Sequence, residues 1–456
     1  MPSRWERSVA VVTASPLHRD AIKTARACAL VVFATLALPV AAGAADAVTF
    51  AKDIAPIFQA NCQSCHRPGN MAPMSLLTYN DARPWARSIK QKVTRREMPP
   101  WFIDKTVGIQ KFKNDPSLTD AQIDAIARWV DAGAPAGNPA DMPPPVKWPD
   151  DEVWNIGTPD LIVSTPPHTM YANGPDVWLD FVVDSGLTED RYIKAIETKP
   201  SKAGRRIVHH ASTYLIQKDD DTVQNAFGDS VKPDERSGGR LGEFAPGKPG
   251  DQFPENTGIL IKAGAKVRFQ MHYFANGEQI TDSTRIGLVF YPKGVTPKYR
   301  VIDPNMGGGC CRDLDIPANT VTRHDAYFPV RKPAKIISYQ PHMHMRGKAQ
   351  TMEAIYPDGH TEILSSVDRF DFNWHIPYVY ADDVAPLLPA GTILHYIAIH
   401  DNTAANPRNP DPTQWVGYGD RSIDDMFQVH LNLVYLEQAD YDRLAKERAA
   451  AKKATN

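Results

Sequence analysis

The stretch that decides the N-terminal fold is Cys62-Gln63-Ser64-Cys65-His66. Two thiols three residues apart on one helical turn can both bond to the vinyl groups of a haem, and the adjacent imidazole can bind its iron. A thioredoxin-like redox pair requires a βαβ setting and a zinc site requires a second cysteine pair, and neither accompanies this motif. The sequence therefore predicts one covalently attached haem c, bound by Cys62, Cys65 and His66.

The other axial position of that haem needs a second ligand, and three methionines follow the motif, at Met71, Met74 and Met98. Met98 precedes two prolines, and a residue before proline is kept out of the helical region, so its thioether sits on a stiff loop. We predict Met98 as the sixth ligand, with Met71 as the next candidate. Core packing is the plainer role for all three methionines.

Helical signals surround the motif over residues 46–135. Asn80 is placed to cap a helix, and Thr119 forms a capping box with Gln122 at the start of another. The apolar stripe of the first of these helices consists of Trp85, Ile89 and Val93. Small helices around a C-x-x-C-H motif are the build of a class I cytochrome c, which this segment resembles.

Residues 1–44 have the pattern of an export signal. Basic residues precede an apolar run at residues 27–40, which is too short to span a bilayer comfortably. Small residues place the cleavage site after Ala44, and an uncleaved anchor is the alternative. We therefore expect a periplasmic protein without a membrane span after cleavage. The neighbouring pair Cys310-Cys311 stays outside the haem motif, and the sequence assigns it no role.

Composition limits the secondary structure and the binding partners that the rest of the chain can have. Proline supplies 39 of the 456 residues, which disfavours long helices, and 51 basic against 53 acidic residues give no basic excess for binding nucleic acid. Residues 136–152 are rich in proline and predict a semi-rigid linker. Runs of β-branched and aromatic residues separated by turn signals predict two β-sandwich units, at 153–300 and 301–440. A helical tail is expected at 441–456.

Histidines gather in three short stretches of this β-region: Val208-His209-His210, Gln270-Met271-His272 and Pro341-His342-Met343-His344. His342 and His344 are two residues apart, so on a strand they share one face and can bind one ion. Imidazole with a thioether such as that of Met426 favours copper, because no cysteine or carboxylate stands in register. Zinc stays possible for three histidines alone, whereas a cupin site would need a glutamate shortly after His344.

The order of these motifs over residues 175–437 resembles the type II copper monooxygenases, the family of peptidylglycine hydroxylating monooxygenase and dopamine β-monooxygenase. The resemblance implies two jelly-roll-like sandwich subdomains that hold one copper each. It implies that the electron-storing copper is bound by His209, His210 and His272. It implies that the catalytic copper, where O₂ and the substrate meet, is bound by His342, His344 and Met426.

Two positions depart from the peptide-amidating members of that family. Those members have an arginine two residues before the H-x-H pair, where this chain has Gln340, and a tyrosine four residues after the copper methionine, where it has His430. A peptidylglycine substrate is therefore not expected. The neighbouring His400 is expected either to pack in the core or to support a copper ligand. Asp425 is expected to be a solvated loop carboxylate, with support of a copper ligand as the alternative.

These patterns predict a periplasmic copper monooxygenase that hydroxylates a C–H bond of a small organic molecule with O₂. Its own haem c would pass electrons singly from a periplasmic donor, and two coppers could store the two electrons that the reaction consumes. The alternative is a non-catalytic haem and copper protein that only transfers electrons or binds copper.

Overall fold

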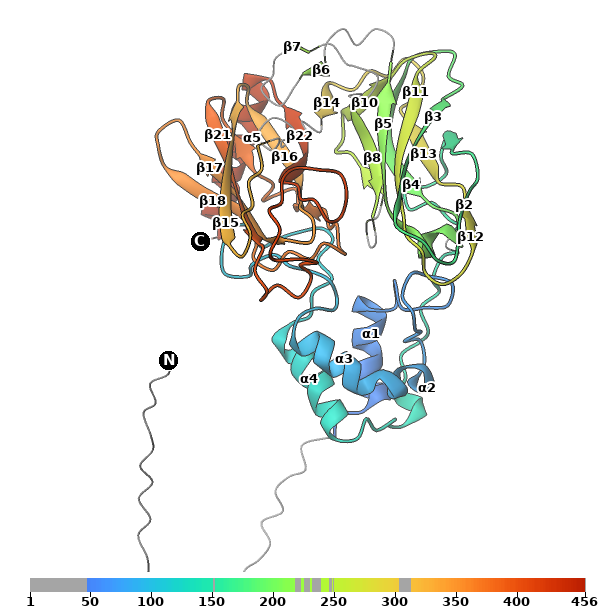
Figure 1. The fold of residues 1–456 in the computed structure, drawn as a ribbon. Helices are drawn as coiled ribbons and strands as arrows, with labels where there is room; N and C mark the ends of the chain where they lie inside the picture. The colour runs from blue at the N-terminus through green and yellow to red at the C-terminus, as the bar shows by residue number, and fades with distance from the viewer. Residues whose placement is uncertain are drawn as a thin grey trace, which may run out of the picture. The chain divides into compact units, whose positions relative to one another are not determined.

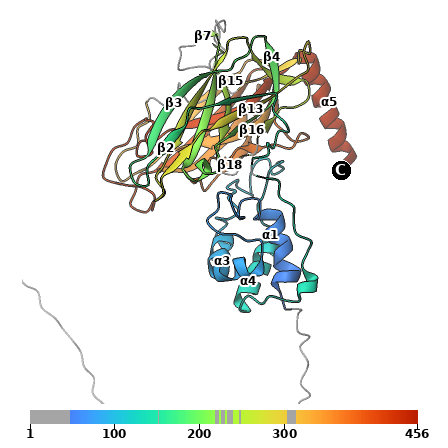
Figure 2. The ribbon, with the colours of Figure 1, turned by 90° about the vertical axis from the view of Figure 1, so that its right-hand side faces the viewer.

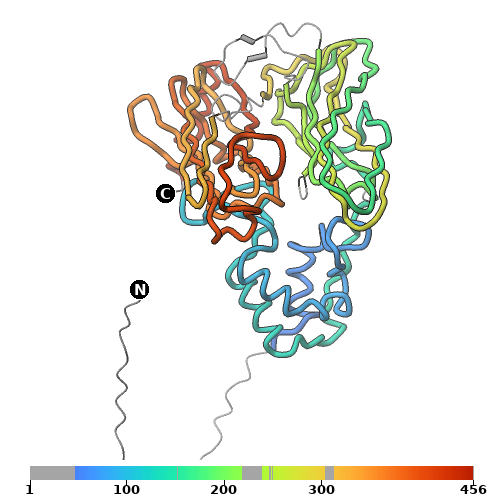
Figure 3. Tube along the Cα trace, viewed as in Figure 1, coloured from blue at the N-terminus to red at the C-terminus, as the bar shows by residue number. Residues whose placement is uncertain are grey.

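The computed structural model describes residues 47–150, 152–217, 223–224, 230–231, 239–245, 248, 250–302 and 313–455. The predicted signal peptide at 1–44 and the pair Cys310-Cys311 lie outside these residues. Within these ranges, no helix has both the length and the apolar character needed to cross a membrane. The described chain passes from a small helical region into a large all-β region with several sheets (Figures 1 and 3).

The helical region consists of short helices. Its α-helices are α1 (Ala55–Asn61), α2 (Tyr79–Ala82), α3 (Ala86–Thr94) and α4 (Asp120–Asp131). A π-helical turn, Phe50–Ile54, leads into α1, and 3₁₀ turns occur at Arg83–Trp85, Pro139–Asp141 and, in the β-region, Gly204–Arg206. The chain ends in α5, Gln438–Thr455, which begins shortly before the predicted tail (Figure 2).

Capping explains where two of these helices begin. The predicted box at α4 is confirmed, since the Thr119 hydroxyl accepts from the Gln122 amide and the Gln122 side chain accepts from the Thr119 amide. The predicted cap at Asn80 is wrong, because Thr78 caps α2 in a reciprocal box with Asp81. The proline after Arg83 then turns the chain into a 3₁₀ segment. Trp85 consequently leaves the apolar stripe and is 44% exposed, while Ile89 and Val93 are buried.

Aromatic side chains fill the core of the helical region. Phe50, Phe58 and Trp129 pack edge to face or tilted, with ring centroids 5.9–6.3 Å apart. The Trp129 indole N–H donates to the carbonyl of Pro135, which also accepts from the Phe50 amide. The residues that enter the predicted linker are thus hydrogen-bonded to the start of the helical region.

The β-region contains the following strands, many of which are short. The first half holds β1 (Leu161–Ser164), β2 (His168–Met170), β3 (Val177–Asp184), β4 (Arg191–Lys199), β5 (Val208–Ile216), β6 (Val223–Gln224), β7 (Ser230–Val231), β8 (Arg240–Phe244), β9 (Asp251–Gln252), β10 (Thr257–Ile261), β11 (Lys266–Tyr273), β12 (Ile280–Asp282), β13 (Arg285–Phe290) and β14 (Tyr299–Ile302). The second half holds β15 (Val321–Val330), β16 (Ala334–His342), β17 (Gly347–Ile355), β18 (Thr361–Val367), β19 (Tyr378–Val379), β20 (Leu387–Leu388), β21 (Thr392–Asp401) and β22 (Gln428–Tyr435).

Three larger sheets organise the described strands. The longest has the order β1-β13-β4-β10-β14-β22-β16-β19, with β9 beside β4 and β20 beside β16. The other two have the orders β3-β11-β5-β8 and β15-β21-β17-β18. The long sheet contributes to two separate hydrophobic cores, one with each four-stranded sheet. Strand β14 pairs with β10 and with β22, so the sheet is continuous through the predicted division near residue 300.

Residues 101–112 pack into the core that the long sheet forms with the sheet β15-β21-β17-β18, although these residues were predicted within the helical region. Trp101 packs edge to face on Tyr378 at 4.7 Å between ring centroids, and Phe112 stacks on Tyr380 at 5.3 Å. Backbone bridges join Ile103 to Val367 and Phe112 to Tyr380. Residues 101–112 therefore link the haem-motif region physically to the β-region.

Candidate functional site

The haem motif continues the last turn of α1. The Cys62 amide donates to the Phe58 carbonyl and the His66 amide to the Cys62 carbonyl, both at 2.9 Å, so the two thiols lie on one turn. Both cysteines are free, and burial raises the pKa of each thiol, that of Cys62 to about 12. Two neutral, unbonded thiols in this arrangement fit covalent haem attachment.

The imidazole of His66 is already oriented for an axial role. Its Nδ1 donates to the backbone carbonyl of Met74 at 3.2 Å, which leaves Nε2 with a lone pair for iron. Burial lowers the pKa of His66, so the ring is neutral near pH 7. Met98 is half-buried beside Val93, Leu118 and Ile123, and its ligation of iron stays a prediction.

A three-histidine group forms where β5 and β11 pair. His210 lies opposite His272, but Tyr273 pairs with Val208, so His209 is the extra residue of a β-bulge. Neighbouring residues on a regular strand point to opposite faces, and the bulge re-aims one of them. One ligand atom from each of His209, His210 and His272 lies within 4.8 Å of the others. The structure thus brings together the three residues predicted for the first copper.

The nitrogens of this group suit a metal ion. Both ring nitrogens of His209 and Nδ1 of His210 are buried without a hydrogen-bond partner among the described residues. Burial, followed by the neighbouring His272, lowers the pKa of His209 to about 3, so the ring keeps its lone pair. His272 donates from Nε2 to Asp176 at 2.9 Å and stacks on Trp178, which fixes the ring and leaves Nδ1 for a ligand.

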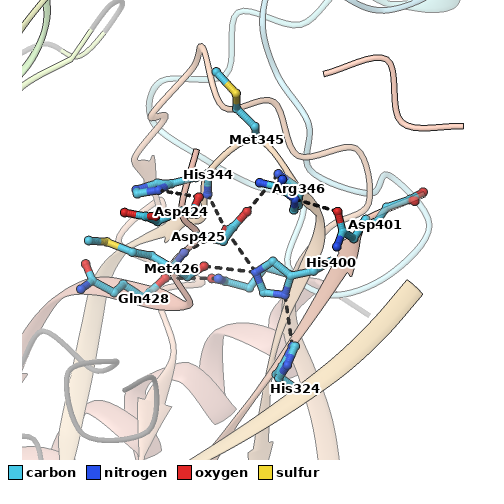
Figure 4. A network of polar contacts seen from close by, with 12 residues as sticks. His324, His344, Met345, Arg346, His400, Asp401, Asp424, Asp425, Met426 and Gln428 are labelled. Atoms are coloured by element: carbon cyan, nitrogen blue, oxygen red, sulfur yellow. Dashed lines mark hydrogen bonds and ion pairs between the residues drawn. The ribbon is translucent and has the colours of Figure 1, made fainter. Parts of the chain in front are cut away.

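The second predicted ligand set comes from the end of β16, the β16–β17 turn and the segment before β22. His342 ends β16, and His344 follows in the turn, with the two ring centroids 5.3 Å apart. His344 Nδ1 donates to the Asp424 carbonyl at 3.3 Å, so its Nε2 is available. Met426 is 8% exposed, and its thioether extends to the same side as the His344 ring (Figure 4).

Asp425 holds this turn together. Its carboxylate accepts from the backbone amides of His344, Arg346 and Met426 at 2.8–3.0 Å (Figure 4). Asp425 is fully buried, so the expectation of a solvated loop is wrong. Burial raises the pKa of Asp425, but His400 and the amide donors lower that pKa by more. The net shift of the pKa is therefore downward. An ionised carboxylate therefore positions both His344 and Met426.

His400 supports Asp425 in turn. One ring nitrogen lies 3.3 Å from the Asp425 carboxylate and 3.2 Å from the Met426 carbonyl. The other lies 3.2 Å from Nδ1 of His324 (Figure 4). The buried His400 thus fits both of its predicted roles, packing and support, and the chain His324–His400–Asp425 reaches the backbone of Met426.

His375 is a site residue that the sequence did not single out. It is 1% exposed and lies between β18 and β19, with Nδ1 3.0 Å from Nδ1 of His342. Its ring centroid lies 5.4 Å from that of His209 and 5.2 Å from that of His210. A lone histidine in Trp374-His375-Ile376 carries no spacing signal, so only the fold could identify it. We call His209, His210, His272, His342, His344 and His375 the histidine cluster.

The two departures from the peptide-amidating pattern face each other. Gln340 on β16 pairs with His430 on β22. The side-chain amide of Gln340 donates to the buried carboxylate of Glu243 at 2.8 Å. The Arg240 guanidinium lies 2.6 Å from the same carboxylate. Burial raises the pKa of Glu243, but the charges of Arg240 and Lys248 lower that pKa by more. The Glu243 carboxylate is therefore ionised. A position held by an amide and a carboxylate does not suit an anionic substrate group.

Comparison with known proteins identifies one part of the chain. Residues 50–130 match the family model described as "Cytochrome C oxidase, cbb3-type, subunit III". The chain therefore carries an N-terminal cytochrome c domain, which supports haem c, haem-based electron transfer and a redox partner. No curated protein matches the chain.

Solved structures add little. The chain resembles the "Crystal Structure of the STIV MCP" at 10% identity and a TM-score of 0.23, over 61% of this chain and 98% of that one. It resembles the "Crystal structure of PBSX exported protein XepA" at 9% identity and a TM-score of 0.15, over 53% and 86%. TM-scores this low do not establish a shared fold.

Proposed function

We propose that the chain is a periplasmic copper-dependent monooxygenase that hydroxylates a C–H bond of a small organic substrate with O₂, using electrons from its own haem c. The observation that carries the proposal is the three-histidine group, because both ring nitrogens of His209 and Nδ1 of His210 are buried without a hydrogen-bond partner in the described chain. Unpaired buried nitrogens cost free energy, and a metal ion would satisfy them. The cytochrome c domain supplies a route for single electrons.

Each ligand set has residues that would hold one copper. His209, His210 and His272 form an all-imidazole group, and His342, His344 and Met426 add a soft thioether that suits Cu(I). When bound, the coppers would supply one-electron storage and O₂ chemistry. One oxygen atom of O₂ enters the substrate, and the other leaves as water with two electrons and two protons.

The protein's own groups would position that chemistry. Asp176 fixes the His272 ring, and Asp425 joins the turn that carries His344 to the segment that carries Met426. Phe372 lies against the rings of His209 and His344, at centroid distances of 5.1 and 5.6 Å, and helps to exclude water between the two ligand sets. The contact of Trp101 with Tyr378 gives electrons from the cytochrome domain a packed path toward the β-region.

The test is copper loading followed by O₂ uptake. The full chain with haem c, purified and reduced, is expected to bind two coppers and to consume O₂ with one of a panel of small substrates that lack a carboxylate. Met426→Leu should retain copper at the three-histidine group and lose substrate-dependent O₂ uptake. His395→Gln, which changes a histidine held between Glu353 and Asp325, is the matched control and should retain both properties.

Two results would change the assignment. A chain that binds no copper overturns the proposal. Two coppers that are reduced through the haem without O₂ uptake on any substrate favour the electron-transfer alternative.

A further inference from the structure

His375 belongs to neither predicted ligand set, yet it packs as closely on the three-histidine group as those histidines pack on each other. Its ring centroid lies 5.4 Å from His209 and 5.2 Å from His210. The centroids within the group are 4.9–5.5 Å apart. The loop that carries His375 is held in place, because the backbone carbonyl of His375 accepts a hydrogen bond from the side-chain amide of Gln340 at 3.3 Å. His375 therefore lies beside this group with its backbone held in place, while the ligand atoms that lie within 4.8 Å of one another come from His209, His210 and His272.

The two ring nitrogens of His375 have different surroundings. Nδ1 lies 3.0 Å from Nδ1 of His342, whereas Nε2 is buried and has no partner among the described residues. A hydrogen bond between two neutral imidazoles needs one donor, and when His375 donates from Nδ1 its Nε2 carries a lone pair. An unpaired buried lone pair is unfavourable unless an ion takes it.

We propose that His375 is a fourth metal ligand beside His209, His210 and His272, with Nε2 as its ligand atom. The inference rests on the proposed function and deepens it by completing the first site. While the second site is empty, four imidazoles would close the first site, whereas a site that binds a reactant keeps an open position.

The hydrogen bond between His375 and His342 makes their ligand roles alternate. When the hydrogen lies on His375 Nδ1, His375 Nε2 is the ligand and His342 Nε2 carries a hydrogen. When His342 donates instead, its own Nε2 becomes the ligand and His375 Nε2 gains a hydrogen, so the pair holds the same number of hydrogens in both states. Filling the second site through His342 thus withdraws His375 from the first.

The experiment isolates the first site. A full-length His344→Ala chain with haem c loses a ligand of the second group only, and it is loaded with one equivalent of Cu(II). Pulsed EPR is expected to count four coordinated imidazoles. Adding His375→Gln, which keeps a similar volume and a polar group beside His342, should lower the count to three and weaken Cu(II) binding at least about tenfold.

Controls separate folding from ligation. His395→Gln in the same background should keep four imidazoles, and the far-UV circular dichroism and haem spectrum of every variant should match the parent. His375→Ala, with the whole side chain removed, should give the same three-imidazole spectrum. An unchanged count after His375→Gln overturns the assignment of His375 while the proposed function stands. A chain that binds no copper, whatever stands at 375, overturns the proposed function instead.

Discussion

In the cytochrome c domain the predicted haem-attachment residues lie between positions 62 and 66, whereas the histidine cluster draws its members from positions 209 to 375. A single helical turn arranges the first set, and its geometry follows from local backbone hydrogen bonds. The second set needs β5, β11, β16 and two loops to meet. Local sequence therefore suffices to recognise one site, while the other exists only through long-range strand pairing.

The supporting groups differ in the same way. His66 is oriented by the carbonyl of Met74, eight residues along the chain. His344 and Met426 are oriented by Asp425, whose carboxylate bridges segments 79–81 residues apart. The haem motif should consequently tolerate damage elsewhere in the chain, and the histidine cluster should not.

The largest expected effect comes from removing both cysteines that attach the haem. Cys62→Ala combined with Cys65→Ala eliminates both thioether bonds, so denatured protein should lose its Soret band completely. The β-region should still fold, because its hydrophobic clusters include neither cysteine. Absorbance after acid–acetone extraction measures covalent haem, and a Soret band retained by the double variant would contradict the assignment.

The next effect tests the long-range site. Asp425→Ala removes a buried carboxylate that three backbone amides and His400 share, and should lower the free energy of unfolding by about 3–5 kcal/mol. Copper at the second ligand set should be lost with it. Asp424→Ala is the matched control, because that side chain pairs with the exposed Arg421 and should cost less than about 1 kcal/mol. Equal denaturation midpoints for the two variants would refute the role of Asp425.

Much of the helical region was readable from the sequence, because its signals are local. The Thr119–Gln122 box is confirmed, and the error at Asn80 is a choice between neighbouring capping residues. The segment from Trp101 to Phe112 could not be assigned locally, because its partners Tyr378 and Tyr380 are distant in sequence.

In the β-region the histidine stretches were visible, but not what brings them together. Period-two reasoning sends His209 and His210 to opposite faces, and only the bulge opposite Tyr273 reconciles them. His375 and the burial of Asp425 depend on loops that pack from elsewhere, so no spacing pattern indicates either.

A smaller, graded effect is expected from pH. Burial is the first cause that lowers the pKa of His209 from 6.5 to about 3, and burial likewise lowers the pKa values of His210, His342 and His375. These rings stay neutral in the folded chain but take up protons when unfolded, so stability is complete above about pH 6.5 and is lost progressively as pH falls toward 3.

Urea denaturation of copper-free protein at several pH values measures this slope. His210→Gln should reduce it, since each pKa unit of difference is worth about 1.4 kcal/mol. A urea midpoint independent of pH between 6.5 and 4 would show that His209, His210, His342 and His375 are not buried in the neutral form.

The smallest effect belongs to the cap of α4. Thr119→Ala removes the acceptor of the Gln122 amide and should lower the free energy of unfolding by about 1 kcal/mol, whereas Thr119→Ser keeps the hydroxyl and should cost a few tenths. Because α4 belongs to the core of the helical region and to neither β-region core, copper binding should not change. Thermal denaturation followed at the Soret band measures the helical region alone, and copper stoichiometry reports on the cluster. A loss of copper in Thr119→Ala would mean that the histidine cluster depends on the helical region, and the contrast between a locally and a distantly assembled site would then fail.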